Sequence, residues 1–190
     1  MNTKAFKPAA ALALSALLAA CAGFELGGFG KTRTQMTLAP ADAATQLMIT
    51  APLTMALATP SRAPRNGQDP LVELTLTHAD GRALEFQEAN HTPNDVMAQA
   101  PGGPLAQVMG FFGQEAPTLY RASEQAAAPF LCGPEGPALL GFYEAPGGGA
   151  VTMVGLKRDF DFETLPNGET QALPYSPDQV CARLKLNAVR

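Results

Sequence analysis

Apolar and polar residues alternate through residues 71–88, and this alternation predicts the clearest element of the chain, a β-hairpin. Every second position is apolar in 72–76 and again in 84–86, and Asp80-Gly81 lies between the two runs. Period-two patterning around Asp-Gly is typical of two antiparallel strands joined by a tight turn. His78 follows the first run on its apolar face, where we expect a packed structural histidine.

A second hairpin is predicted over residues 138–157, where β-branched and aromatic side chains flank a Pro-Gly-Gly-Gly turn. Short helices are expected at 92–99, 105–112 and 177–184. These segments show a capping residue, a proline at the first helical position or apolar residues at helical spacing. The segment 113–128 carries no clear pattern.

Together these elements predict an α+β fold, a mainly antiparallel β-sheet with two or three short helices, in a single domain over residues 36–190. The alternative is two small β units joined near residues 100–128. Units of about 65 residues would bury only roughly 60% of their unfolded surface and would be marginally stable. One shared core is therefore the preferred prediction.

The N-terminus has the character of a secretory signal. Lys4 and Lys7 precede an apolar run over residues 9–20. This run is too short to cross about 30 Å of hydrocarbon as a helix. It ends in Leu-Ala-Ala followed by Cys21, which resembles the lipobox of bacterial lipoproteins.

The resemblance implies that residues 1–20 are cleaved and that Cys21 is acylated, with residues 21–35 as a glycine-rich tether. Three acyl chains on one cysteine exceed what stable anchoring in a bilayer needs. In lipoproteins an Asp after the cysteine commonly retains the protein at the inner membrane. The residue here is Ala22, so the expected place is the outer membrane, facing the periplasm.

Composition and charge limit the kinds of molecule that the domain is expected to bind. The chain is 46% hydrophobic and 16% charged, as expected for a folded domain, and removal of residues 1–20 leaves 11 basic and 17 acidic residues, a net charge of −6. Such a surface excludes nucleic acid, because binding to a phosphate backbone needs a basic surface. We therefore expect contact with the lipid bilayer through Cys21 alone, and an envelope protein or peptidoglycan as the partner of the domain.

Two cysteines remain once Cys21 is assigned to lipid. Cys132 and Cys181 are an even remainder in an oxidising compartment, which predicts a disulfide. The alternative, a catalytic thiol, would need a histidine nearby to lower the thiol pKa. Both histidines, His78 and His91, lie far from either cysteine in sequence.

Motifs for catalysis are missing from the sequence. It contains no nucleophile elbow, phosphate-binding loop, dinucleotide fingerprint, zinc-protease motif or EF-hand pattern. We therefore expect no catalytic residue, metal or cofactor, and predict a non-enzymatic, membrane-anchored envelope lipoprotein that serves as a binding or structural module. The alternative is a periplasmic hydrolase in which His78 or His91 pairs with a carboxylate.

A further alternative comes from the residues before the second hairpin. Phe130-Leu131-Cys132-Gly133, with Cys181 near the end of the chain, is similar to the membrane-bound inhibitors of C-type lysozyme. The chain lacks that family's Ser-Gly-x-x-Tyr type loop and contains no tryptophan. The resemblance implies a lysozyme-inhibitor-like module.

Overall fold

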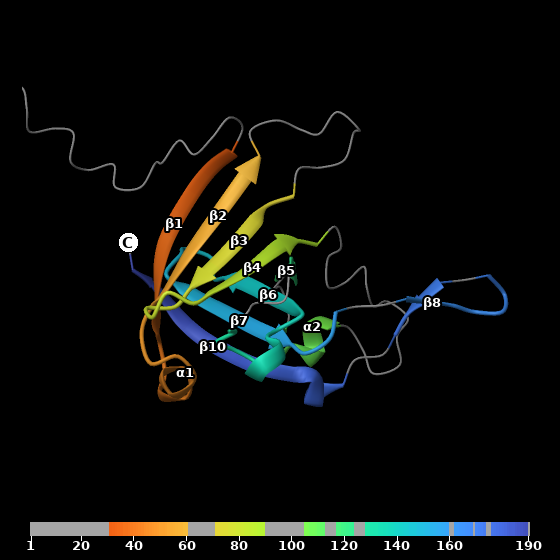
Figure 1. Ribbon diagram of the computed structural model, residues 1–190. Coiled ribbons are helices and arrows are strands. Elements are labelled where there is room, and N and C mark those ends of the chain that lie inside the picture. The colour runs from red at the N-terminus through yellow and green to blue at the C-terminus, as the bar shows by residue number, and fades with distance from the viewer. Residues whose placement is uncertain are drawn as a thin grey trace, which may run out of the picture.

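Eight strands close into a barrel in the computed structural model, which describes residues 31–60, 71–89, 105–112, 117–123, 128–159, 162–168, 170–173 and 176–189 (Figure 1). The order around the barrel is β1-β10-β7-β6-β5-β4-β3-β2, and every neighbouring pair is antiparallel. The strands are β1 (Lys31–Pro40), β2 (Leu53–Pro60), β3 (Glu73–Thr77), β4 (Ala83–Glu88), β5 (Thr118–Ala122), β6 (Leu139–Glu144), β7 (Ala150–Leu156) and β10 (Val180–Val189).

The first and last strands pair with each other and so close the barrel. Thr37 of β1 lies opposite Val189 of β10, and the register runs on to Pro40 opposite Leu186. The predicted α+β fold is therefore wrong, because the sheet is closed and the described residues hold only two short α-helices. Alternation within a strand indicates which side chains face inward, but it does not indicate whether the outer strands of a sheet meet.

Both closing strands differ from the sequence-based expectation. β1 begins at Lys31, inside the segment 21–35 expected as a tether, and β10 begins at Val180, inside the predicted helix 177–184. Only a 3-10 turn, η2 (Pro177–Gln179), occupies the start of that segment. In β10, buried residues alternate with exposed ones from Ala182 onward, so the period-two pattern prevails over the helix-starting signal before it.

The other two predicted helices, and the segment without a clear pattern, can be compared with the structure in the same way. The segment 105–112 begins with a helix of one turn, α2 (Leu105–Val108), and Phe112, expected in the core, is 69% exposed. The predicted helix 92–99 lies outside the described residues. Strand β5 lies within the unassigned segment 113–128.

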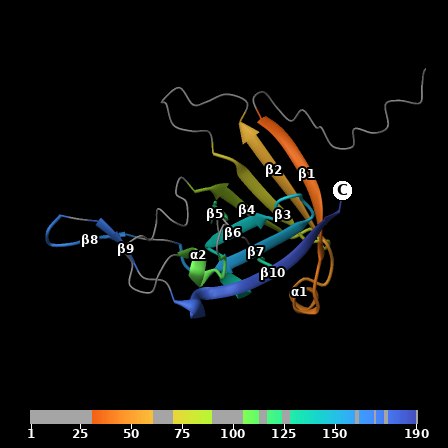
Figure 2. The ribbon, with the colours of Figure 1, turned by 180° about the vertical axis from the view of Figure 1, so that it is seen from behind.

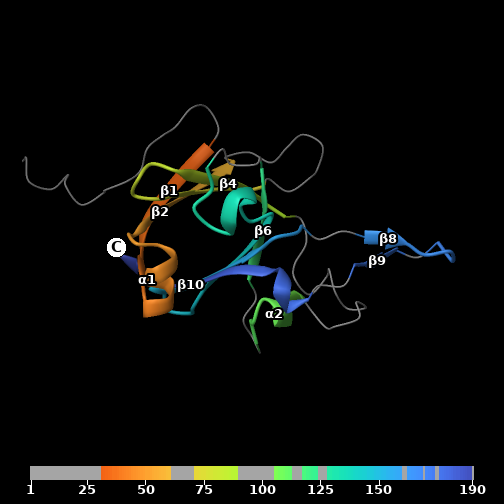
Figure 3. The same ribbon diagram turned by 60° about the horizontal axis from the view of Figure 1, so that its bottom comes forward.

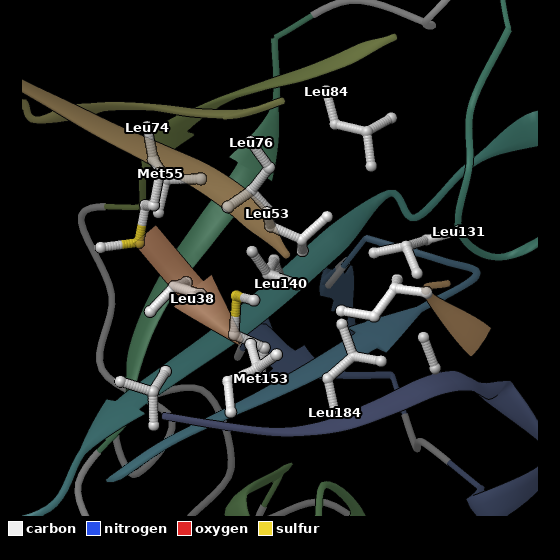
Figure 4. Close-up of a cluster of buried hydrophobic side chains, with 14 of the residues drawn as sticks. Leu38, Leu53, Met55, Leu74, Leu76, Leu84, Leu131, Leu140, Met153 and Leu184 are labelled. Carbon is white, nitrogen blue, oxygen red and sulfur yellow. The ribbon is translucent and has the colours of Figure 1, made fainter. Parts of the chain in front are cut away.

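Apolar side chains fill the inside of the barrel (Figure 4). An eight-stranded barrel encloses just enough room for side chains to fill. Leu74 and Leu76 of the first predicted hairpin share this core with Leu140 and Met153 of the second, so the two hairpins bury their apolar faces together. The buried members of the core are Leu38, Ile49, Leu53, Met55, Leu74, Leu76, Leu84, Phe86, Tyr120, Leu131, Leu140, Val151, Met153, Ala182, Leu184 and Leu186.

A second, smaller cluster lies where α2 packs on the outside of β5, β6 and β7. Leu105 and Met109 are fully buried there, together with Val154 of β7. Gly141 of β6 permits this contact, because a Cβ at that position would lie 2.4 Å from Cε of Met109. The outward-facing residues of this half of the barrel are apolar because the helix covers them.

Helix α1 (Ala43–Met48) follows β1 and packs beside β10. The Asp42 carboxylate caps it by accepting a hydrogen bond of 2.8 Å from the Thr45 backbone N–H. The Thr45 hydroxyl oxygen in turn accepts one from the Lys185 backbone N–H, also at 2.8 Å. Ile49 then enters the barrel core.

The up-and-down strand order sorts the connections between two ends of the barrel. We call one the N-terminal end, because β1 starts there at Lys31 and β10 finishes there at Val189. The opposite end carries α1, the 78–82 turn, the segment 128–138 and the connection from β7 to β10. We call it the plugged end, because Phe130 and Leu131 of the segment 128–138 pack into the barrel core there.

A small separate sheet lies in the connection from β7 to β10. It consists of β8 (Phe162–Thr164) and β9 (Thr170–Ala172), which pair only with each other. This hairpin extends away from the barrel in three views (Figure 1, Figure 2 and Figure 3).

Candidate functional site

Cys132 and Cys181 form the predicted disulfide. Their Cα atoms are 5.0 Å apart, and the bond joins the segment before β6 to the second residue of strand β10. Gly155 of β7 faces the bond, since a Cβ there would lie 3.0 Å from Sγ of Cys132 and 3.4 Å from Cβ of Ala182. The close fit explains why the inward-facing position at 155 holds a glycine.

The residues just before Cys132 close one end of the barrel. Leu131 belongs to no strand, yet it is 4% exposed and lies in the barrel core (Figure 4). Phe130 packs against the same core. Phe130 and Leu131 therefore act as a plug, which the disulfide ties to β10. These are also the residues that resemble the lysozyme inhibitors, and in this chain they serve packing.

His78, Asp80 and Arg82 meet in the turn between β3 and β4, next to this plug. His78 Nδ1 lies 2.9 Å from Asp80 Oδ2, and Arg82 donates to the same oxygen from Nε and Nη2 at 2.8 Å. Hydrogen bonds from the side chain and backbone of Arg82, and then from His78, hold the pKa of Asp80 well below its usual range. The Phe130 ring centroid lies 5.4 Å from the His78 ring and 5.9 Å from Cζ of Arg82.

A histidine held by a carboxylate can act as a general base if it also reaches a reacting group in a cleft. The His78 side chain is 11% exposed and its ring packs on Phe130. Asp80 also accepts a hydrogen bond of 3.0 Å from the Arg82 backbone N–H, and Arg82 donates to the Pro129 carbonyl at 3.4 Å. These contacts fasten the turn to the plug, which is a structural role for His78.

Three adjoining hollows follow β4 on the outside of the barrel, and we call them together the β4 groove. The largest, about 490 Å³, reaches Glu135 and Lys157 at the plugged end. The other two, of about 430 and 290 Å³, continue along the strand past Gln87, and all three share Ser123. The groove exists because β4 and β5 pair at only three positions, Phe86 to Glu88, so the wall is interrupted beside them.

Charged side chains of both signs line the β4 groove. The acidic ones are Glu73, Glu85, Glu88 and Glu135, and the basic ones are Arg33, Arg121 and Lys157. Lys157 donates a hydrogen bond of 3.1 Å to the Asp178 carbonyl, and Arg121 forms an ion pair with Asp159. Mixed charge of this kind suits hydrogen bonding to a polar chain more than it suits an apolar ligand.

At the N-terminal end of the groove, Glu88 lies opposite a buried tyrosine of the barrel core. Glu88, which lines the groove there, accepts a hydrogen bond of 3.1 Å from the Val72 backbone N–H. Tyr120 lies opposite Glu88 in the pairing of β4 with β5 and is 5% exposed. Burial, together with the nearby charge of Glu88, raises the pKa of Tyr120 to about 12.

Several predicted features lie beyond these sites. Cys21, residues 1–20 and His91 are outside the described residues. Within the described ranges, no group of three or more His, Cys, Asp or Glu side chains could hold a metal ion. In that part of the chain no helix has the length and apolar character needed to cross a membrane.

Comparison with known proteins gives no relative. No protein family matches the chain, and neither a curated protein nor a solved structure is detectably similar to it.

Proposed function

We propose that this chain is a lipoprotein of the bacterial envelope, anchored to the outer membrane by acylated Cys21 and facing the periplasm, whose barrel is a non-enzymatic binding module. The signal-like residues 1–20 and the Leu-Ala-Ala-Cys motif support the anchor. Residues 22–30 separate Cys21 from β1, a link that can span at most about 30–35 Å when fully extended. Such a link keeps the N-terminal end of the barrel close to the bilayer.

The filled interior supports binding on the outer surface. Barrels of eight strands that carry a small ligand keep a cavity inside, whereas the interior of this barrel holds fully buried leucines such as Leu38 and Leu76. The β4 groove carries the proposal, because it is a long hollow with polar and charged walls on a rigid scaffold. Its form fits an extended segment of an envelope protein or a peptidoglycan strand better than a compact apolar ligand, which favours enclosed, mostly apolar pockets.

Detergent phase partitioning of the full chain tests the anchor. We expect the wild-type protein in the detergent phase and Cys21→Ser in the aqueous phase, because three acyl chains dominate the partitioning. Ala22→Asp is the matched control: it keeps the lipid, and should move the protein from the outer to the inner membrane on a density gradient. If Cys21→Ser still entered the detergent phase, the lipid anchor would be disproved.

Photo-crosslinking in cells tests the groove. A photoreactive amino acid at the exposed Gln87, inside the groove, is expected to give a product with a protein or with peptidoglycan. The same residue at the exposed Thr37 of β1, which lines none of the three hollows, is the control. Equal yields at both positions would show that the groove is not a binding site.

A further inference from the structure

Strand β1 continues past the end of its barrel partner β10. It pairs with β2 from Lys31 to Leu38, but with β10 only from Thr37 onward, because β10 ends at Val189. Residues 31–36 therefore have a strand on one side and no described strand on the other. Figure 2 shows β1 extending beyond the end of β10. We call residues 31–36 of β1 the open edge.

The backbone of the open edge offers hydrogen bonds to another strand. Ala41, just after β1, donates from its N–H to the Lys185 carbonyl of β10 at 2.8 Å. In an antiparallel sheet, residues that bond to one neighbouring strand alternate with residues that bond to the other, and the register of β1 shows no shift. Every second residue back from Ala41 therefore turns its N–H and C=O groups to the open side, and in the open edge these are Lys31, Arg33 and Gln35.

The side chains of the open edge indicate which kind of strand fits it. Met36 packs against the barrel core, so Arg33 and Gln35 point outward, where both are exposed. Lys31 Nζ lies 2.6 Å from a carboxylate oxygen of Glu73, whereas Arg33 has no ion-pair partner within the described ranges. Side chains directly opposite in an antiparallel pair share a face and interact. The open edge therefore fits a strand with carboxylates on its outer face and apolar residues on its inner face.

A second copy of the open edge fits less well. If two copies pair antiparallel with the greatest overlap, Arg33 of one lies opposite Arg33 of the other, and like charges directly opposite are destabilising. A shift of the register in one direction places Lys31 opposite Arg33. A shift in the other direction leaves only Arg33 and Gln35 to pair, because Thr37 already pairs with Val189 of β10. Charge on an edge strand is a common means of preventing such self-association.

We propose that the open edge is a docking site for an extended segment of another protein, in which acidic residues alternate with apolar ones. The main chain of that segment continues the sheet past the end of β10, a common mode of peptide recognition. Its apolar side chains lie beside Met36, and a carboxylate lies opposite Arg33. This site goes beyond the proposed function, because the main chain of β1 forms it without the anchor at Cys21 and without the β4 groove.

Binding of two matched peptides to the full chain in detergent micelles tests the site. The first probe is a fluorescent peptide of about seven residues in which Glu and Val alternate, and the second has Lys in place of each Glu. Fluorescence anisotropy measures the dissociation constants. We expect the Glu peptide to bind with a constant below about 1 mM and the Lys peptide to bind at least about tenfold more weakly, because the charge of the edge is complementary only to the first.

Gln35→Pro tests the main chain of the open edge. The Gln35 N–H points to the open side and not to β2, so a proline there removes a donor of the edge and spares the pairing of β1 with β2. We expect the Glu peptide to bind at least about fivefold more weakly, as the loss of one hydrogen bond implies. Gln35→Ala is the matched control, since it removes the same side chain, keeps the N–H and should bind the peptide as the wild type does.

Arg33→Gln tests the charge and decides the question if Gln35→Pro fails to fold. An exposed ion pair contributes modestly, so we expect the Glu peptide to bind about two- to fivefold more weakly to this variant. Lys185→Gln is the matched control, because it removes the same charge from an exposed position of β10 outside the open edge. This control should leave the binding of the peptide unchanged.

Several results would overturn the proposal. Equal binding of the two peptides, or no binding of the Glu peptide at about 1 mM, would mean that the charges of the open edge only prevent self-association. Equal binding by Gln35→Pro and Gln35→Ala would place the peptide elsewhere. A wild-type dimer that Gln35→Pro converts to a monomer in sedimentation would mean that a second copy occupies the edge.

The proposed function fails or stands separately from the open edge. Photo-crosslinking at Gln87 reports on the β4 groove, and Gln87 lies in β4, on which the open edge does not depend. The Gln87 product should therefore have the same yield in Gln35→Pro as in the wild type. If no Gln87 product forms while the Glu peptide binds as expected, the groove is wrong and the open edge stands.

Discussion

Removal of the disulfide is expected to destabilise the barrel by about 4 kcal/mol. Cys132 and Cys181 are 49 residues apart in sequence, and a bridge over a loop of that length removes about 14 cal/mol/K of entropy from the unfolded chain. At room temperature this corresponds to roughly 4 kcal/mol. A folded region of roughly 150–160 residues loses about 2–4 °C of melting temperature per kcal/mol, so we expect a fall of about 8–16 °C.

Differential scanning calorimetry of Cys132→Ser/Cys181→Ser checks this magnitude. In a strong reductant the wild-type protein should have the same melting temperature as the double variant. The reductant should not change the melting temperature of the variant. A loss below about 1 kcal/mol would refute the reasoning, because it would mean that the two segments stay close in the unfolded chain without the bond. A single-cysteine variant is unsuitable because it leaves a free thiol that can pair between molecules.

Two further changes test the plugged end. Folding lowers the pKa of Asp80, so the ionised carboxylate stabilises the fold above its usual pKa near 3.8, and this contribution is lost as the pH falls through the depressed folded pKa. In urea unfolding at decreasing pH, Asp80→Asn should therefore lose less stability than the wild type. Gly155→Ala should cost about 1–3 kcal/mol, because the new Cβ meets a disulfide sulfur that cannot move away, whereas Gly141→Ala should cost less because the mobile end of Met109 can shift.

The sequence was sufficient to predict the strand pairs that form locally. Strands β3 and β4 occupy the hairpin 71–88 with its Asp80-Gly81 turn, and β6 and β7 occupy 138–157. In both cases a tight turn joins two strands with a clear local signal, polar alternation in β3 and β4 and β-branched and aromatic residues in β6 and β7, so all the information lies within about twenty residues. The disulfide was predictable for a different reason, since only two cysteines were left to pair.

Closure of the barrel was not predictable, because it depends on contacts between the two ends of the chain. In β1 the only apolar residues that reach the core are Met36 and Leu38, with threonines at the inward-facing positions before them, so the strand has a weak pattern. In β10 the Ser-Pro-Asp sequence before Val180 carries a strong helix signal that ends after one turn. The β4 groove had no signal, since it results from how few residues of β4 and β5 pair.

Titration of the tyrosines tests how the barrel closes around Tyr120. The chain contains three tyrosines and no tryptophan, so the ultraviolet absorbance of tyrosinate can be followed without interference. Burial and the charge of Glu88 raise the pKa of Tyr120 to about 12, from an ordinary value of 10.0. In the folded protein one tyrosine should therefore ionise about two pH units above the ordinary pKa. The absence of this late transition in Tyr120→Phe would assign it to Tyr120.

The same shift makes stability depend on alkaline pH. A group whose pKa is raised by folding stabilises the fold fully below its unfolded pKa, and this contribution disappears as the pH rises through the folded value. We therefore expect the wild-type barrel to lose stability between about pH 10 and pH 12 more steeply than Tyr120→Phe. Glu88→Gln should lower the pKa of Tyr120 only partly, because burial is the larger cause of the shift. If Tyr120 ionised near its ordinary pKa in the folded protein, the phenol would be hydrated, and the seam between β4 and β5 would be open to water at that point.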